Sequence, residues 1–370
     1  MTNTFKIEII REIKDLENIK KEWDSLYESS DNNHPFASFE WILCFYKSYL
    51  IESAIRVVLL KKDGKITAIL PGFIEQLSHR KIPFKLNTFH FAVNAHTPRC
   101  GLIAKKNDLK SINLILVMLL KRYKKIDLFI FPNVYQQSNL NTVINKLKNR
   151  IVYIENMYKS PAYDISAGWE NYLKTRSKSF RKSLKKANTN LSFEREIKLE
   201  CLYPKTDSSL VINRLKKIDS KTWQYENNTG LFSNEQNSTF YTLLMTFYAN
   251  VNDILISFLS VDNKDIGYEI SVEKNKSAYF LKTGFDPIYR KNSPGNVIKA
   301  LLTEHYSSKG FNEIDLVGES TDGKRRWATH ERIHRNYWII NFTFKGLMLS
   351  VLLQIKKYQN LISKLRLRND

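Results

Sequence analysis

A run of three strand-like segments followed by a loop and a helix constrains the fold more than any other feature of this chain. The segments are rich in β-branched and aromatic residues and follow one another closely: 254–263, 266–275 and 277–285. Asp262-Asn263 and Lys274-Asn275 separate them. Short polar links between apolar runs are typical of tight turns, so these segments predict an antiparallel meander.

The meander is one part of a longer α/β pattern. A helix is predicted over 296–308, with Gly310 at its end and a strand over 312–318. The first half of the chain repeats this pattern weakly, with two strands joined by Asp63-Gly64. We therefore expect an α/β (α+β) protein of two domains, 1–160 and 161–345, with a boundary near Ser160-Pro161. A basic amphipathic helix over 346–370 is expected to follow.

Composition excludes several classes of protein. Hydrophobic residues make up 43% of the chain and aromatic residues 12%, which excludes a disordered chain. Three cysteines, Cys44, Cys100 and Cys201, are too few for a disulfide framework, which favours a reducing compartment. Residues 1–20 lack the apolar core of a secretory signal, and no apolar run reaches the roughly 20 residues of a membrane span. We expect a cytoplasmic protein, soluble or peripheral.

The charge points to an anionic partner. Lys and Arg number 58 against 37 Asp and Glu, a formal net charge of +21. Such an excess fits nucleic acid, an acidic membrane surface or a phosphate-bearing small molecule. A general bias of composition toward lysine and asparagine would give the same excess.

The loop before residue 296 has the chemistry of an anion site. The first turn of a helix leaves amide N–H groups without intrahelical partners, and these groups and the helix dipole favour a phosphate. Gly295 permits close approach of a ligand, and the neighbouring cations add charge. An ordinary capped helix start has similar features. The residues expected to bind here are Arg290, Lys291, Ser293, Pro294, Gly295 and Asn296.

At these residues the sequence resembles a known family. The run F-D-P-x-Y-R-K-x-S-P-G-x-V-I-K, residues 285–299, resembles the acyl-CoA pyrophosphate loop of GNAT-type acyltransferases, and in particular the CelD-like (cellulose-biosynthesis-associated) acetyltransferase branch. Three other segments resemble that branch: Pro35 to Trp41, the basic region 169–186, and Asp315 to Trp327. Gly323 departs from the family pattern, which has an aromatic residue before the lysine, Lys324.

The resemblance implies tandem GNAT-like domains, each with a mixed, mostly antiparallel sheet flanked by helices. It also implies an acyl-CoA-dependent N-acyltransferase, using acetyl-CoA or another acyl-CoA and no metal, with Lys324 near the cofactor. The acceptor would be an amine on a small molecule or a lipid-linked sugar, as in cell-envelope or polysaccharide biosynthesis. The related Fem-type aminoacyltransferases share the tandem architecture and use aminoacyl-tRNA, so this remains an alternative.

Direct attack of an amine on a thioester requires a base, and the leaving thiolate takes up a proton. The candidates are Glu269, Asp286 and Tyr289, with Tyr268 beside them. Glu269 is also compatible with an exposed strand position, Asp286 with a turn before Pro287, and the tyrosines with the core.

Three further segments allow other interpretations. His330-Glu331-Arg332-Ile333-His334 matches the H-E-x-x-H zinc motif, but no third ligand follows it, so we expect a loop or turn there and no metal. Residues 173–193 hold seven cations and no acid, and 345–369 hold no acid either. Residues 173–193 fit contact with CoA phosphates, an anionic substrate or tRNA. Residues 345–369 fit an anionic membrane at the inner face or a helix docked on the domain. A catalytically silent basic protein that binds membranes or nucleic acid is the third hypothesis.

Overall fold

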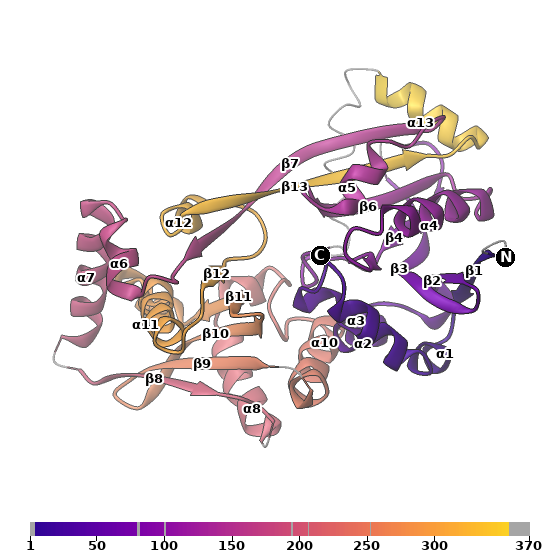
Figure 1. Ribbon diagram of the computed structural model, residues 1–370. Helices are drawn as coiled ribbons and strands as arrows, with labels where there is room; N and C mark the ends of the chain where they lie inside the picture. Colours follow the sequence, from indigo (N-terminus) through magenta and orange to yellow (C-terminus); the bar gives the residue numbers. More distant parts are fainter. Residues whose placement is uncertain are drawn as a thin grey trace. The chain divides into compact units, whose positions relative to one another are not determined.

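The computed structural model describes residues 4–79, 82–99, 101–193, 195–205, 207–251 and 253–354, apart from the side chains of 155–157. The chain forms two compact units. Unit 1 comprises residues 1–158 and 333–370, and unit 2 comprises Lys159–Arg332 (Figure 1). Among the described residues, no helix is both long and apolar enough to span a bilayer.

Unit 1 holds a mixed sheet in the order β1-β2-β3-β4-β6-β13, with β5 beside β3. The described pairs within it are antiparallel, except the parallel pair β4–β6. Its strands are β1 (Phe5–Ile10), β2 (Ile55–Lys62), β3 (Lys65–Leu77), β4 (Leu86–Phe91), β5 (Ile103–Ala104), β6 (Leu128–Tyr135) and the main part of β13 (His330–Ile340). Its helices are α1 (Ile13–Glu17), α2 (Lys20–Glu28), η1 (Pro35–Ala37), α3 (Phe39–Tyr49), η2 (Glu52–Ala54), α4 (Leu109–Arg122), α5 (Asn139–Ile144) and α13 (Phe344–Gln354).

In unit 2 the strands follow one another in the order β7-β12-β11-β10-β9-β8, antiparallel except for the parallel pair β11–β12. Its strands are the last part of β7 (Ile151–Asp164), which begins in unit 1, and β8 (Ile197–Leu202), β9 (Ile254–Val261), β10 (Lys264–Lys274), β11 (Ser277–Phe285) and β12 (Glu313–Asp315). Its helices are α6 (Trp169–Lys174), α7 (Lys178–Ser192), α8 (Ser208–Asp219), α9 (Trp223–Glu226), α10 (Glu235–Thr246), η3 (Tyr248–Asn250), η4 (Pro287–Asn292), α11 (Pro294–Ser308) and α12 (Asp322–Arg325).

The hairpins form where the sequence predicts them. Asp63-Gly64, Asp262-Asn263 and Asn275-Lys276 all have positive φ, as two-residue type I′ turns require. The meander of β9, β10 and β11 is thereby confirmed. Together the two units confirm the expected α/β fold with mostly antiparallel sheets flanked by helices.

Several boundaries differ from the prediction. The two units divide between Tyr158 and Lys159, close to the boundary predicted at Ser160-Pro161, although β7 runs unbroken across it from Ile151 to Asp164. Unit 2 ends at Arg332 instead of 345, because β13 continues into unit 1 and pairs there with β6. The sequence predicts a strand over 126–131 that ends at Pro132, but β6 continues past this proline, because the register shifts beside it and Asn133 adopts a positive φ. Proline, which lacks an N–H, is tolerated at such an irregularity.

The sequence pattern predicts continuous helices over 167–189 and 208–227, but capping residues interrupt both. Ser177 caps the start of α7 by accepting a hydrogen bond from the Phe180 amide, so α6 and α7 are two separate helices. Thr222 does the same for α9. Strand β8 was not predicted. The predicted basic helix 346–370 is described only as far as Gln354; the remainder lies outside the described residues, as does Cys100.

One hydrophobic core fills the face of the unit 2 sheet that carries α6, α7 and α11. It includes Phe180 of α7, Leu259 of β9, Phe280 of β11, Val297 of α11 and Trp327. Helix α8 also contacts β10 and β11. The alternation of strand side chains therefore sends Glu269 toward α11 and its neighbour Tyr268 toward α8, where the Tyr268 hydroxyl donates to Asp219 Oδ1 at 2.8 Å.

Replacing Gly284 by alanine is expected to destabilise the protein by about 1–3 kcal/mol. A Cβ at this position would overlap the Tyr268 ring, which is buried and held by Asp219. Urea denaturation measures the change. Gly323→Ala is the control, because its added Cβ would meet no atom closer than Thr321 Oγ1 at 3.9 Å. Equal stability of the two variants would contradict the packing described here.

Candidate functional site

The ladder between β11 and β12 is short and leaves one edge of β11 open. Ser277–Tyr279 pair with Glu313–Asp315, and the register ends there. The chain then turns away, because Val317 and Gly318 adopt left-handed φ values of 47° and 66°. Among the described residues, no strand pairs with this edge of β11 beyond Tyr279. Such an edge offers backbone N–H and C=O groups to an extended ligand.

The open edge leads to the start of α11. Ser293, the N-cap residue, has φ 52° and ψ 52°, and its side chain makes no capping hydrogen bond. In contrast, Ser177, Asp207 and Asn234 cap α7, α8 and α10 with their side chains. The first turn of α11 thus lacks the side-chain cap that would compete with an anion.

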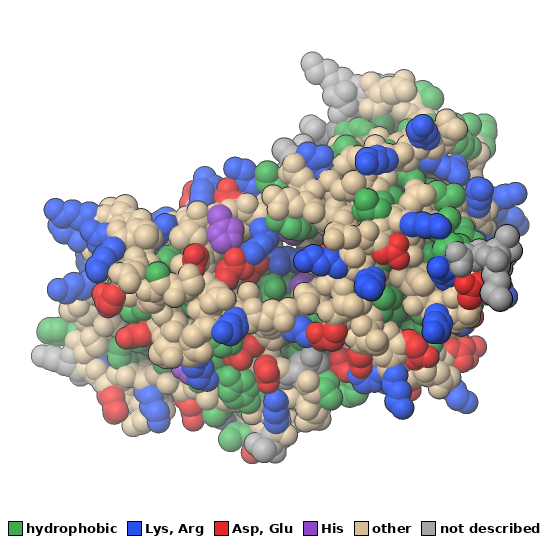
Figure 2. Space-filling model, in the orientation of Figure 1, with side chains coloured by type: hydrophobic (Ala, Val, Ile, Leu, Met, Phe, Trp, Pro, Cys, Tyr) green, Lys and Arg blue, Asp and Glu red, His purple; other side chains and the backbone are tan. Residues whose placement is uncertain are grey.

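The loop before α11 carries the predicted cations. Arg290 and Lys291 lie in η4, and both are exposed. Neither forms an ion pair with an acidic side chain of the described residues. The loop is tied to α7, since Asn292 Nδ2 donates to the Asn190 carbonyl at 3.1 Å. Helix α7 itself presents exposed lysines, and Lys and Arg side chains gather over its position in Figure 2.

The loop also meets the 324–327 segment. The Trp327 indole donates to Asn296 Oδ1 at 3.4 Å, and its ring packs edge-on against Phe180 of α7 at 5.0 Å. Arg326 donates to Ser183 of α7 at 2.8 Å. The structure therefore brings together the three segments of unit 2 that carry the sequence resemblance.

Glu269 lies in the middle of β10 and is fully buried. Thr283, opposite it on β11, donates its hydroxyl to Oε2, while Oε1 is buried without a hydrogen-bond partner among the described residues. Burial raises the pKa of Glu269 to about 7, although the charges of Lys299 and Lys324 and the Thr283 hydroxyl act in the opposite direction. A carboxyl group with this pKa can both accept and release a proton near neutral pH.

Two lysines share this environment. Burial lowers the pKa of Lys299, on α11, and the charge of Glu269 opposes that effect. Burial, followed by repulsion from Lys299, lowers the pKa of Lys324 to about 8. Lys324 Nζ donates to the Val317 carbonyl at 2.6 Å and so holds the turn after β12. The structure therefore places the Lys324 ammonium group at the turn that follows β12.

The other predicted catalytic residues are engaged elsewhere. Asp286 is buried and pairs with Lys221 at 2.9 Å. It also caps η4 by accepting the Ile288 amide. Burial would raise the pKa of Asp286, but these two hydrogen bonds outweigh it and hold the pKa below its usual value. Tyr289 is partly buried against the unit 2 core, and its amide donates to the Asp286 carbonyl at 3.0 Å.

The H-E-x-x-H segment belongs to β13, so it is neither the loop or turn expected from the sequence nor a helix. His330 pairs with Glu313 at 3.1 Å, and His334 Nδ1 contacts the Asn133 carbonyl at 3.2 Å. In the part of the chain that the structure describes, no group of His, Cys, Asp and Glu side chains could hold a metal ion. Cys44 and Cys201 are free thiols.

Comparison with known proteins agrees with this geometry. Residues 178–326, from α7 to α12, match the family model described as an acetyltransferase (GNAT) domain. No curated protein matches the chain. Unit 2 therefore carries a GNAT-type acyltransferase domain.

Solved structures extend the likeness to the whole fold. FemX has a TM-score of 0.58 at 11% identity, and the match covers 91% of this chain and 98% of FemX. The C-terminal domain of a putative lysylphosphatidylglycerol synthetase from Agrobacterium fabrum scores 0.55 at 9% identity, covering 91% and 97%. A tandem GNAT protein from the clavulanic acid biosynthesis pathway scores 0.50 at 7% identity, covering 90% and 98%. The chain thus has a tandem GNAT-like fold.

Proposed function

We propose that this protein is an acyl-CoA-dependent N-acyltransferase whose donor binds to unit 2. The observation that carries the proposal is the first turn of α11, which has no side-chain cap, beside the exposed cations Arg290 and Lys291. The diphosphate would rest at this turn beside the Gly295 amide and the Asn296 side chain, since Pro294 lacks an N–H and the Asn296 amide already donates to the Ser293 carbonyl at 2.9 Å. The extended arm of the donor would lie along the open edge of β11.

The chemistry would proceed by direct transfer. The acceptor amine attacks the thioester carbonyl carbon, Glu269 takes a proton from the nitrogen directly or through one water molecule, and the carbon–sulfur bond breaks. Backbone N–H groups on the open edge of β11 would stabilise the oxyanion. The thiolate leaves and takes up the proton that Glu269 removed from the nitrogen, which restores the carboxylate of Glu269. We assign the base to Glu269 because the carboxylate of Asp286 is already held by Lys221 and the Ile288 amide.

The finer features of the proposal come from the sequence motif. The 285–299 motif favours a CelD-like N-acetyltransferase that uses acetyl-CoA and acts in the cytoplasm. The acceptor would be an amine on a sugar or on a cell-envelope or polysaccharide precursor.

Calorimetric titration with acetyl-CoA tests the proposal, and saturable binding with one site is the expected result. At a concentration a hundredfold above Kd, the ligand should stabilise the folded state by about 2.7 kcal/mol, seen as a higher unfolding temperature. Desulfo-CoA and free adenosine diphosphate serve as controls that retain the diphosphate. Absence of heat and of any thermal shift with all acyl-CoA thioesters would refute the proposal.

A second candidate is aminoacyl transfer from charged tRNA. The exposed cations of α7 and the FemX-like fold favour it. This candidate predicts that charged tRNA co-purifies with the protein and that acetyl-CoA has no effect. Titration with both donors distinguishes the two functions.

A further inference from the structure

One face of α13 exposes large apolar side chains. Phe344 is 80% exposed, Leu347 44%, Met348 36% and Val351 59%. Their spacing of three, four and seven residues places them on a single face of the helix. We call these four residues the apolar stripe. Exposed positions on a helix normally carry polar side chains, so a contiguous exposed apolar surface such as the stripe indicates an interaction site.

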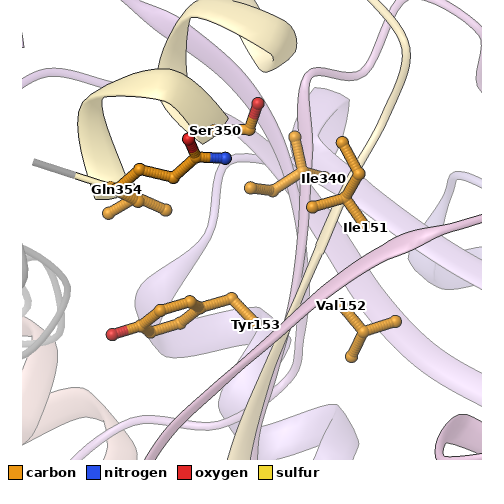
Figure 3. Close-up of a pocket in the computed structure, with 7 residues that line it drawn as sticks. Ile151, Val152, Tyr153, Ile340, Ser350 and Gln354 are labelled. Atoms are coloured by element: carbon orange, nitrogen blue, oxygen red, sulfur yellow. The ribbon is translucent and has the colours of Figure 1, made fainter.

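The stripe is not needed to attach α13 to unit 1. Gly346, Leu349 and Leu353 lie on the opposite face and are buried. Leu349 and Leu353 pack in a core with Trp338 and Ile340 of β13. A cavity of about 260 Å³ adjoins the flank of the helix between the two faces (Figure 3). It is lined by Ile151, Val152, Tyr153, Ile340, Ser350, Leu353 and Gln354.

Cations lie near the start of α13. The Arg150 guanidinium lies 5.8 Å from the centre of the Phe342 ring, and Phe342 itself is 55% exposed. Lys345 Nζ donates to the carbonyl of Lys85, whose side chain is exposed. Figure 2 shows hydrophobic side chains with Lys and Arg among them over the region that α13 occupies in Figure 1.

The sequence after α13 also combines cationic and apolar residues. Residues 355–370 contain one acidic residue, Asp370, and five cations: Lys356, Lys357, Lys364, Arg366 and Arg368. Apolar residues such as Ile362 and Leu365 lie between them. Each cation near an anionic membrane contributes about 1 kcal/mol of attraction.

We infer that the apolar stripe docks on the surface of an anionic phospholipid bilayer. Phe344, Leu347 and Val351 would enter the boundary between headgroups and acyl chains, and the nearby cations would face the headgroups. Charge distinguishes this partner from a second copy of the chain, since pairing two copies through α13 would bring like charges together. The inference does not depend on the proposed transferase activity.

Flotation of the full chain with vesicles tests the inference. We expect binding to vesicles of phosphatidylcholine with phosphatidylglycerol, little binding to phosphatidylcholine alone, and loss of binding as salt rises. The double variant Phe344→Ser with Val351→Ser should bind the anionic vesicles about tenfold more weakly or worse. The matched control is Ile51→Ser in unit 1, which removes a side chain that is 74% exposed and should leave binding unchanged.

Three results would overturn the inference. The first is equal vesicle binding by the double variant and the wild-type protein. The second is a concentration-dependent dimer that the double variant abolishes, which would assign the stripe to a second copy. The third is a marked fall in the unfolding temperature of the double variant without vesicles, which would show that the chain covers the stripe itself.

Discussion

Replacing Gly295 by aspartate is expected to weaken acetyl-CoA binding about a hundredfold or more while leaving the fold intact. The new carboxylate would occupy the first turn of α11, compete with the diphosphate for the amide there, and repel the phosphates. Loss of one charge-assisted hydrogen bond, about 1.5–3 kcal/mol, together with this repulsion accounts for that factor. Calorimetric titration measures it.

The Gly295→Asp variant is expected to bind acetyl-CoA more weakly but to be at least as stable as the wild-type protein. A Cβ at Gly295 would lie 3.6 Å from Thr283 Cγ2, an ordinary van der Waals contact, and the residue has no positive φ that a side chain would strain. An acidic residue in the first turn of a helix is stabilising, typically by about 0.3–1 kcal/mol. The protein itself therefore does not require glycine here, whereas a bound diphosphate does.

Ser209→Asp provides the matched control, because it places the same charge at the second position of α8, far along the chain from the loop. It should leave acetyl-CoA binding unchanged. If Gly295→Asp bound acetyl-CoA as tightly as this control, the diphosphate would have to bind elsewhere, and the proposed donor site would be wrong.

Local signals in the sequence predict much of unit 2. The turn residues Asp262-Asn263 set the register of the meander, and the interval between Gly284 and Asn296 marks the loop before α11. Such features depend on a few neighbouring residues. The single strand β7 was divided in the prediction because Pro161 is a local signal for a break, whereas its pairing with β12 is a long-range contact.

The contacts of the candidate site are also long-range and could not be predicted from local sequence signals. Glu269 could be singled out as a carboxylate in a strand. Its burial, its bond to Thr283 and the charges of Lys299 and Lys324 depend on the pairing of β10 with β11 and the packing of α11. No spacing in the sequence signals those contacts. Conversely, Asp286 stands in a motif, yet the structure engages its carboxylate with Lys221, 65 positions away.

Replacing Glu269 by glutamine is expected to lower the rate of acyl transfer by about 10²–10⁴-fold, the usual contribution of a general base. Glutamine has the same shape, and its amide oxygen can still accept the Thr283 hydroxyl, so donor binding should be retained. A fall in kcat with an unchanged acetyl-CoA affinity is therefore the expected pattern. Equal losses in rate and in donor affinity would point instead to a structural role.

The pH dependence identifies the group more directly. Because the pKa of Glu269 is about 7, the fraction of the ionised base, and hence kcat/KM, should rise with pH through 7 in the wild-type protein. That limb should disappear in the glutamine variant, while any limb from the acceptor amine remains. Glu273→Gln is the matched control: Glu273 lies on the same strand, and burial also raises its pKa.

The pH dependence of the free energy of unfolding is an independent measure of the ionisation of Glu269. The folded pKa of Glu269 lies above its ordinary value of 4.5, so the folded state binds more protons than the unfolded state between about pH 4.5 and 7. The contribution of this group to the free energy of unfolding therefore falls as pH rises through that window. Glu269→Gln should flatten the fall and should be at least as stable as the wild-type protein above pH 7. A variant with an unchanged pH profile of stability would show that Glu269 ionises normally, and it would remove the physical basis for assigning it as the base.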